Sequence, residues 1–153
     1  MMKRGQVIGA AVGLFVIAGA IGLGVGRLAP SATVRQIGQT DVLEGYDLFN
    51  QANHELALNH HANADAASSE AAGYLFSAVT PLQSMGIDYA SGITTYLQGA
   101  EYDVVHGTAS AKQRAVLRTF HQAFTPLAHY QFGQIPEASF QSALSRVNSA
   151  INR

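Results

Sequence analysis

Residues 136–151, PEASFQSALSRVNSAI, carry the clearest structural pattern in the chain. Apolar side chains recur there at intervals of four, three and four residues, at Phe140, Leu144, Val147 and Ile151. Because an α-helix has ~3.6 residues per turn, this spacing places all four side chains on one face. The stretch therefore predicts an amphipathic helix whose apolar face is buried against a core.

The preceding segment has the same helical period, and its hydroxyl residues Thr108 and Ser110 are both suited to cap its amino terminus. Its apolar face consists of Val116, Leu117, Phe120, Phe124 and Leu127. Pro126 leaves two alternatives: a kink, because the carbonyl of Gln122 loses its donor, or a separate short helix over residues 125–133. The apolar face continues in phase past Pro126, which favours one kinked helix.

Two further helices are predicted upstream. The first covers residues 41–79 and aligns these apolar side chains on one side of its helical wheel: Val42, Tyr46, Phe49, Leu56, Ala67, Ala71, Tyr74 and Ala78. Thr80 and Pro81 then form a typical helix start, a capping hydroxyl followed by proline at the first position, and Gly107 ends the second helix. Residues 31–40 are small and polar without a clear period, so they are predicted to be a linker.

Residues 7–26 contain no charged side chain, and this length of twenty residues is what an α-helix needs to cross ~30 Å of hydrocarbon. Lys3 and Arg4 precede the run, so the positive-inside tendency places the amino terminus in the cytoplasm and the rest of the chain outside it. The predicted location is the cell membrane, as a single-pass protein. The alternative is a signal peptide cleaved near Ala32, which would release a secreted helical protein. The apolar run exceeds the ~7 to 15 residues typical of a signal peptide, which favours the uncleaved anchor.

The predicted fold class is therefore all-α, with an N-terminal single transmembrane helix followed by an antiparallel four-helix-bundle-like domain. Short polar connections between amphipathic helices favour antiparallel neighbours. The predicted organisation is a membrane anchor over residues 1–30, a linker over 31–40 and an extracytoplasmic helical domain over 41–153.

Small residues line one face of the predicted span: Gly5, Gly9, Gly13, Ala20 and Gly24. Such a face lets two membrane helices approach closely, so it is a candidate self-association face. The alternative is that glycine is simply common in membrane helices. The expected partners are the lipid bilayer through residues 7–26 and either a second copy of the chain or another protein.

The residue inventory excludes several chemistries. The chain has no cysteine, and therefore no disulfide, thiolate metal site or cysteine nucleophile. His54 and Glu55 begin the zinc-protease helix motif, but Leu58 stands where that motif needs its second histidine. The sequence also has no catalytic serine motif and no basic cluster large enough for nucleic acid. It therefore predicts a protein that is not an enzyme and has no cofactor, metal or nucleic-acid partner.

Histidine is the most suggestive residue type, with six in the chain. His54 and His61 lie on a polar face of the first predicted helix, while His60 points into its apolar face, where a hydrogen-bonded core histidine is expected. From Thr33 onward the chain has six cations and ten carboxylates, so its net charge is −4 with neutral histidines and +2 with all six protonated. Imidazole titrates near pH ~6.5, which makes these three histidines the candidate pH-responsive residues.

The preferred function is a non-enzymatic interaction or scaffold module that presents a helical bundle outside the cytoplasm. This expectation follows from the predicted anchor, the small-residue face and the lack of a catalytic motif. The alternative is a ligand-binding or pH-sensing helical domain that acts through a partner, because no cytoplasmic output domain is predicted.

Overall fold

The computed structural model describes residues 32–130 and 134–153, and all regular structure in these ranges is helical. It contains the helices α2 (Ala32–Ala57), α3 (His61–Ser84), α4 (Ala90–Val105), α5 (Ala111–Phe124) and α6 (Glu137–Ile151). The predicted all-α class is confirmed, with five helices in the described ranges where four were predicted. The predicted span over residues 7–26, with its small-residue face, lies outside those ranges. None of the helices within them is both long enough and apolar enough to cross a membrane.

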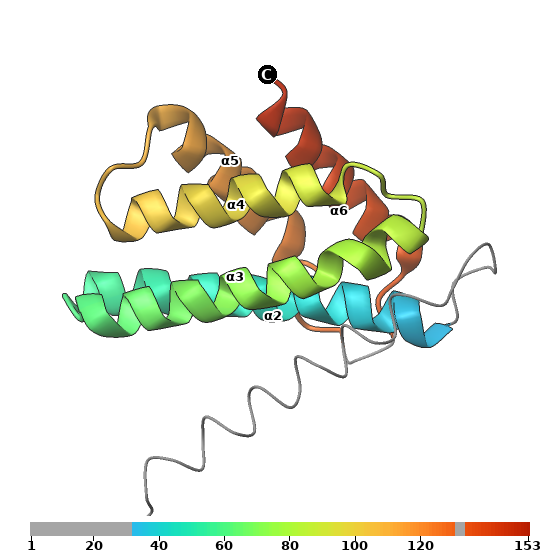
Figure 1. The fold of residues 1–153 in the computed structure, drawn as a ribbon, viewed down its shortest axis with the longest axis horizontal. Coiled ribbons are helices and arrows are strands. Elements are labelled where there is room, and N and C mark those ends of the chain that lie inside the picture. The colour runs from blue at the N-terminus through green and yellow to red at the C-terminus, as the bar shows by residue number, and fades with distance from the viewer. Residues whose placement is uncertain (1–31, 131–133) are drawn as a thin grey trace, which may run out of the picture.

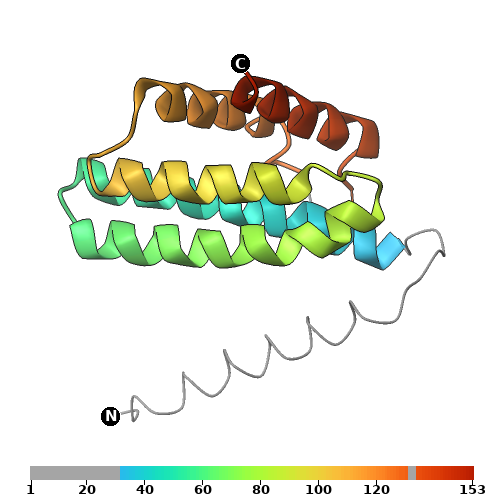
Figure 2. The same ribbon diagram turned by 45° about the horizontal axis from the view of Figure 1, so that its top comes forward.

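The described helices form a compact bundle around one core. α2 and α3 lie side by side along most of their length, and α4 packs along α3 (Figure 1). α5 and α6 pack against each other and cover the opposite side of α4 (Figure 2). Each of the five helices contributes buried side chains to the main hydrophobic cluster.

Three helices end in the same way, at a residue with left-handed backbone geometry. These residues are Asn59, Gly86 and Gly107, with φ values of 59°, 81° and 74°. After α2, His60 N donates to Glu55 O and Asn59 N donates to Leu56 O, both at 2.9 Å. This pair of hydrogen bonds is a Schellman motif, and the same pairing follows α3 and α4. The predicted stop at Gly107 is therefore confirmed.

The predicted single helix over residues 41–79 is wrong. The chain reverses at residues 58–60, and α2 and α3 fold back on each other (Figure 1). Asparagine tolerates left-handed geometry better than most residues, so Asn59 accommodates the reversal without glycine. The helical periodicity is real on both sides of the turn, but it belongs to two helices that face each other.

Pro81 lies inside α3, so the predicted helix start at Thr80 and Pro81 is also wrong. The nitrogen of Pro81 has no hydrogen to donate to Ser77 O, so the last turn of α3 lacks one helical hydrogen bond. Pro81 also packs closely on α2, since a β-carbon built at Gly38 would lie 2.9 Å from Pro81 Cβ. A helix-breaking residue is therefore accommodated where it costs one hydrogen bond and provides a contact.

Residues 32–40 are helical in the structure, where the sequence predicts a linker. Gly38 and Gln39 are buried in this segment. Since its buried positions hold glycine and glutamine instead of large apolar side chains, hydrophobic periodicity carries no signal there. The first turns of α2 are thus defined by their contact with α3.

α5 begins at the cap that Ser110 was predicted to form. Ser110 Oγ accepts a hydrogen bond from Gln113 N at 3.1 Å, and Gln113 Oε1 accepts one from Ser110 N at 2.7 Å, which completes a capping box. Both alternatives predicted around Pro126 are wrong for the residues described, because α5 ends at Phe124 and only turns and a bend follow over residues 125–130. Thr125, the residue before the proline, keeps αR backbone geometry with φ −48° and ψ −44°, and its N–H donates to His121 O, so the chain passes from α5 directly into these turns.

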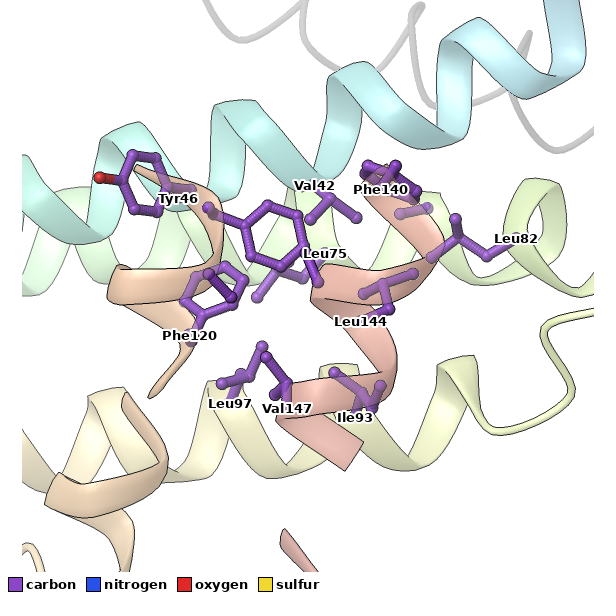
Figure 3. Close-up of a cluster of buried hydrophobic side chains, with 14 of the residues drawn as sticks. Val42, Tyr46, Leu75, Leu82, Ile93, Leu97, Phe120, Phe140, Leu144 and Val147 are labelled. Atoms are coloured by element: carbon purple, nitrogen blue, oxygen red, sulfur yellow. The ribbon is translucent and has the colours of Figure 1, made fainter. Parts of the chain in front are cut away.

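α6 matches its prediction, and its apolar face is inserted into the core. Phe140, Leu144 and Val147 are buried, and Figure 3 shows them among side chains from the other helices. The ring of Phe140 meets that of Phe124 edge to face, with centroids 5.8 Å apart. A further edge-to-face contact joins Tyr46 and Phe120 at 5.9 Å. Aromatic packing therefore connects α5 both to α6 and to α2.

Candidate functional site

Polar and titratable side chains gather at one end of the bundle, where α2 turns into α3 and where α4 ends. We call this region the turn end; it comprises residues 52–68 and 100–110. Figure 1 shows the reversal between α2 and α3 and the carboxyl end of α4 at the same end of the molecule. Four of the six histidines of the chain lie in this region: His54, His60, His61 and His106. Its carboxylates are Glu55, Asp65, Glu101 and Asp103.

Among the described residues, Glu101 is the only carboxylate, imidazole or cationic side chain that is buried, with 1% of its surface exposed. The side-chain amide of Asn53 donates to Glu101 Oε1 at 3.2 Å and to Phe49 O at 2.8 Å. Burial raises the pKa of Glu101 to about 7, because it removes the hydration that stabilises the charged form. Near neutral pH the carboxyl group is therefore divided between its protonated and ionised forms.

The interior around this part of α4 is built from small side chains. On α2, α3 and α4 the main hydrophobic cluster ends at Phe49, Ala71 and Leu97. The buried apolar residues outside that cluster are Ala52, Ala64, Ala67, Ala100, Val105 and Ala109. Glu101 is thus the largest fully buried side chain of the turn end, at a position where a bundle would ordinarily place a large apolar residue.

A second carboxylate, that of Glu55, forms hydrogen bonds across the turn between α2 and α3. Glu55 Oε2 accepts hydrogen bonds from His60 Nδ1 at 2.9 Å and from Asn63 Nδ2 at 3.0 Å. The bond from Asn63 and then the bond from His60 lower the pKa of Glu55. His60 is exposed, so its predicted position in the core is wrong. The reason is that α2 has already ended, and the ring contacts Glu55 from the surface.

His106, the residue after α4, contacts both α4 and α3. His106 stacks on Tyr102 with centroids 4.0 Å apart, and its Nδ1 donates to Tyr102 O at 2.8 Å. Its Nε2 lies 3.8 Å from Asp65 Oδ1 at the start of α3. With Nδ1 acting as the donor, Nε2 of the neutral ring has no proton to offer the carboxylate, so protonation converts this contact into an ion pair.

A groove of about 610 Å³ lies between these elements. It is lined by Leu56, His61, Ala62, Asp65, Val104, Val105, His106 and Gly107. Leu58 and Tyr102, which are 49% and 58% exposed, lie close to lining residues along the chain. The groove therefore combines apolar side chains with two imidazoles and one carboxylate.

Another groove, of about 440 Å³, lies between the end of α5 and α6. It is lined by Ala123, Pro126, Leu127, Tyr130, Ala138, Ser139, Ser142, Ala143 and Arg146. Arg146 is the only charged residue among these. Because no buried polar group accompanies it, this groove is a weaker candidate than the one at the turn end.

The predicted pH-responsive histidines all lie at the turn end, in three different settings. His54 is exposed on the last turn of α2, His60 binds Glu55, and His61 lines the groove. Within the described ranges, no three potential metal ligands lie close enough to share an ion. The sequence did not predict that Glu101 is buried. The signal that was available is its place on the buried face of α4, one turn after Leu97.

The fold and the site together define a helical-bundle domain with a groove at one end that is lined by two imidazoles and one carboxylate. Comparisons with protein-family models, curated proteins and solved structures found no match.

Proposed function

We propose that the protein is a non-enzymatic interaction module that is anchored in the cell membrane by residues 7–26 and binds a protein partner at the turn end, outside the cytoplasm. The observation that carries the proposal is the groove of about 610 Å³, whose lining residue His106 stacks on the exposed ring of Tyr102 and whose lining residue Leu56 is followed two positions later by exposed Leu58. Exposed aromatic and aliphatic residues next to a concave, partly apolar surface are typical of protein interfaces. The uncharged run and the cations before it support the anchor.

Site-specific photo-crosslinking tests the proposed interface. A photoreactive residue replaces Ala62, which is exposed and lines the groove, in the full-length chain in intact cells. The expected result is one defined adduct, with another protein or with a second copy. The matched control replaces Ser145, an exposed residue of α6, and should give no such adduct. Equal labelling from both positions, or none from Ala62, would contradict an interface at the turn end.

The anchor is tested separately. The full-length protein should remain with the membrane after extraction with alkaline carbonate, and its amino terminus should be intact. A mature chain that is soluble and begins near Ala32 would show a cleaved signal peptide and a secreted bundle.

The second candidate function is a pH-responsive binding domain, which is favoured by the burial of Glu101 in the region that also holds four histidines. The two candidates differ in how the crosslink depends on pH. A constitutive module should give the same adduct yield at pH 5.5 and pH 8, whereas a pH-responsive domain should give yields that differ severalfold.

A further inference from the structure

We propose that Glu101 is a proton-binding site that controls how closely the carboxyl end of α4 packs against α2 and α3. Through this packing it controls the shape of the groove at the turn end. The inference deepens the proposed function because it concerns the same groove. It can be tested without any partner, so its failure is distinguishable from the failure of the interface.

The connection between Glu101 and the groove is one turn of helix. Val105 follows Glu101 by four residues, so the two side chains lie on the same buried face of α4. Val104, Val105 and His106 form the α4 side of the groove. A movement of α4 that brings the carboxylate to water therefore also moves this side of the groove.

The packed arrangement suits the neutral carboxyl group. Asn53 supplies one hydrogen bond to Glu101 at 3.2 Å while its other bond goes to Phe49 O. One shared amide does not replace the hydration shell of a carboxylate, so an ionised Glu101 is strongly disfavoured in this interior. The buried apolar side chains of the turn end are alanines and one valine, which limits the apolar contact that would hold α4 in place against this cost.

The ionisable groups on the elements around Glu101 do not offset its burial. Within the turn end and the first turn of α5 they are His54 and Glu55 on α2, His60 in the reversal, His61 and Asp65 on α3, Tyr102 and Asp103 on α4, His106 after it, and Lys112 and Arg114 on α5; farther along the same elements and on α6 lie Glu70, Arg118, Glu137 and Arg146. Glu55 is bound to His60, Asp103 accepts from Thr108 and Gln113, and Arg114 donates to Ala109 O. Burial is the cause of the raised pKa of Glu101.

The contact between His106 and Asp65 has the same dependence on protons. Its 3.8 Å separation becomes an ion pair only when the imidazole is protonated. Glu101 therefore favours the packed position of α4 under mildly acidic conditions, and its ionisation as the pH rises releases this end of the helix.

Hydrogen exchange of the full-length protein in detergent tests this proposal. Amide protection is measured over residues 101–107 at pH 5.5 and pH 8, with correction for the intrinsic exchange rate at each pH. A carboxyl group whose pKa rises from 4.5 to about 7 on folding should make local opening roughly 30-fold more frequent at pH 8. The Glu101→Gln variant, which mimics the neutral carboxyl, should remain protected at both pH values.

The matched control is Glu70→Gln, which changes an exposed carboxylate of α3 and should keep the pH dependence of the unmodified protein. In parallel, carbon NMR of glutamate-labelled protein should show one carboxyl that titrates near neutral pH and is missing from Glu101→Gln. The titration itself is measured on the unmodified protein, and the variant serves only to assign the signal to Glu101. Protection that does not change with pH, or a Glu101 carboxyl that titrates near 4.5, would overturn the proposal.

Discussion

Gly45 of α2 lies directly against Leu75 of α3. A β-carbon built at Gly45 would stand 2.9 Å from Leu75 Cγ and 3.0 Å from its Cδ2, distances shorter than van der Waals contact. Leu75 is 1% exposed and has little room to move. This close approach sets the spacing of α2 and α3, which share the most extensive contact in the bundle.

Gly45→Ala should therefore destabilise the protein by about 1 to 3 kcal/mol, because an added methyl group in a filled interface forces the helices apart. The free energy of unfolding is measured by urea denaturation of the full-length protein. The control is Gly99→Ala in α4, where a β-carbon would meet nothing within 4 Å. That variant should gain about 0.5 to 1 kcal/mol from the higher helix propensity of alanine. Equal effects of the two substitutions would show that the close approach is not maintained.

Phe140→Ala should lower the free energy of unfolding by about 3 to 5 kcal/mol, because it removes a buried ring and leaves a cavity beside Phe124. Phe76→Ala is the matched control, since this ring on α3 is 72% exposed. Its effect should stay within about 0.5 kcal/mol. A large loss at Phe76 would instead reveal that its face of α3 is covered in the assembled protein.

The global stability should fall as the pH rises from 5 to 8. The folded state raises the pKa of Glu101 from 4.5 to about 7, so it binds this proton more tightly than the unfolded chain does. The resulting stabilisation is complete below pH ~4.5 and is lost as the pH passes through about 7. The expected loss between pH 5 and pH 8 is on the order of 2 to 3 kcal/mol.

Urea denaturation at the two pH values checks this expectation, with Glu101→Gln as the comparison. In that variant the loss should largely disappear, and at pH 8 the variant should be more stable than the unmodified protein. A stability that rises from pH 5 to pH 8 in both proteins would show that other groups dominate.

Asn53→Ala should cost more at pH 8 than at pH 5. The Asn53 amide donates to the Glu101 carboxyl group, and a hydrogen bond to an ionised acceptor is worth about 1.5 to 3 kcal/mol, compared with about 1 kcal/mol to a neutral one. Gln51→Ala, an exposed substitution on α2, should show no such difference. Thermal or urea unfolding of both variants at each pH measures it, and an equal cost of Asn53→Ala at both pH values would argue against the bond to Glu101.

Ser110→Ala should destabilise the protein by about 1 kcal/mol, because it leaves the backbone N–H of Gln113 without its capping acceptor. Ser110→Asp keeps an acceptor at the same place and should recover most of the loss. Ser145→Ala, in the exposed middle of α6, should be neutral or slightly stabilising. Losses of equal size at both serines would point to a general effect of removing hydroxyl groups.

The parts of the fold that sequence reasoning predicted correctly are those with strong local signals. α6 has an unbroken apolar period, the cap at Ser110 is followed by glutamine at the matching position, and Gly107 ends α4. Each of these features depends only on residues that lie within one or two helical turns of one another. The all-α class followed from them for the same reason.

The errors occurred where two local signals competed. Pro81 is a common helix start, but Gly86 lies five residues later and ends α3 instead. Asn59 terminates α2 with the geometry usually given to glycine, and the amphipathic pattern continues beyond it. Only the packing of one helix on another decides between such signals, because the free-energy differences within each turn are small.

The sequence by itself determined that the described domain is helical and where several of its helices begin and end, since caps and apolar periods act over a few residues. The tertiary structure alone decided that α2 and α3 are two helices, that Gly45 lies on Leu75, and that Glu101 is buried one turn before Val105, which lines the groove. A glutamate has the same local preferences whether it faces water or a neighbouring helix. Its pKa is raised because the neighbouring helices exclude water from the carboxyl group, and the proposed proton-binding role depends on that burial.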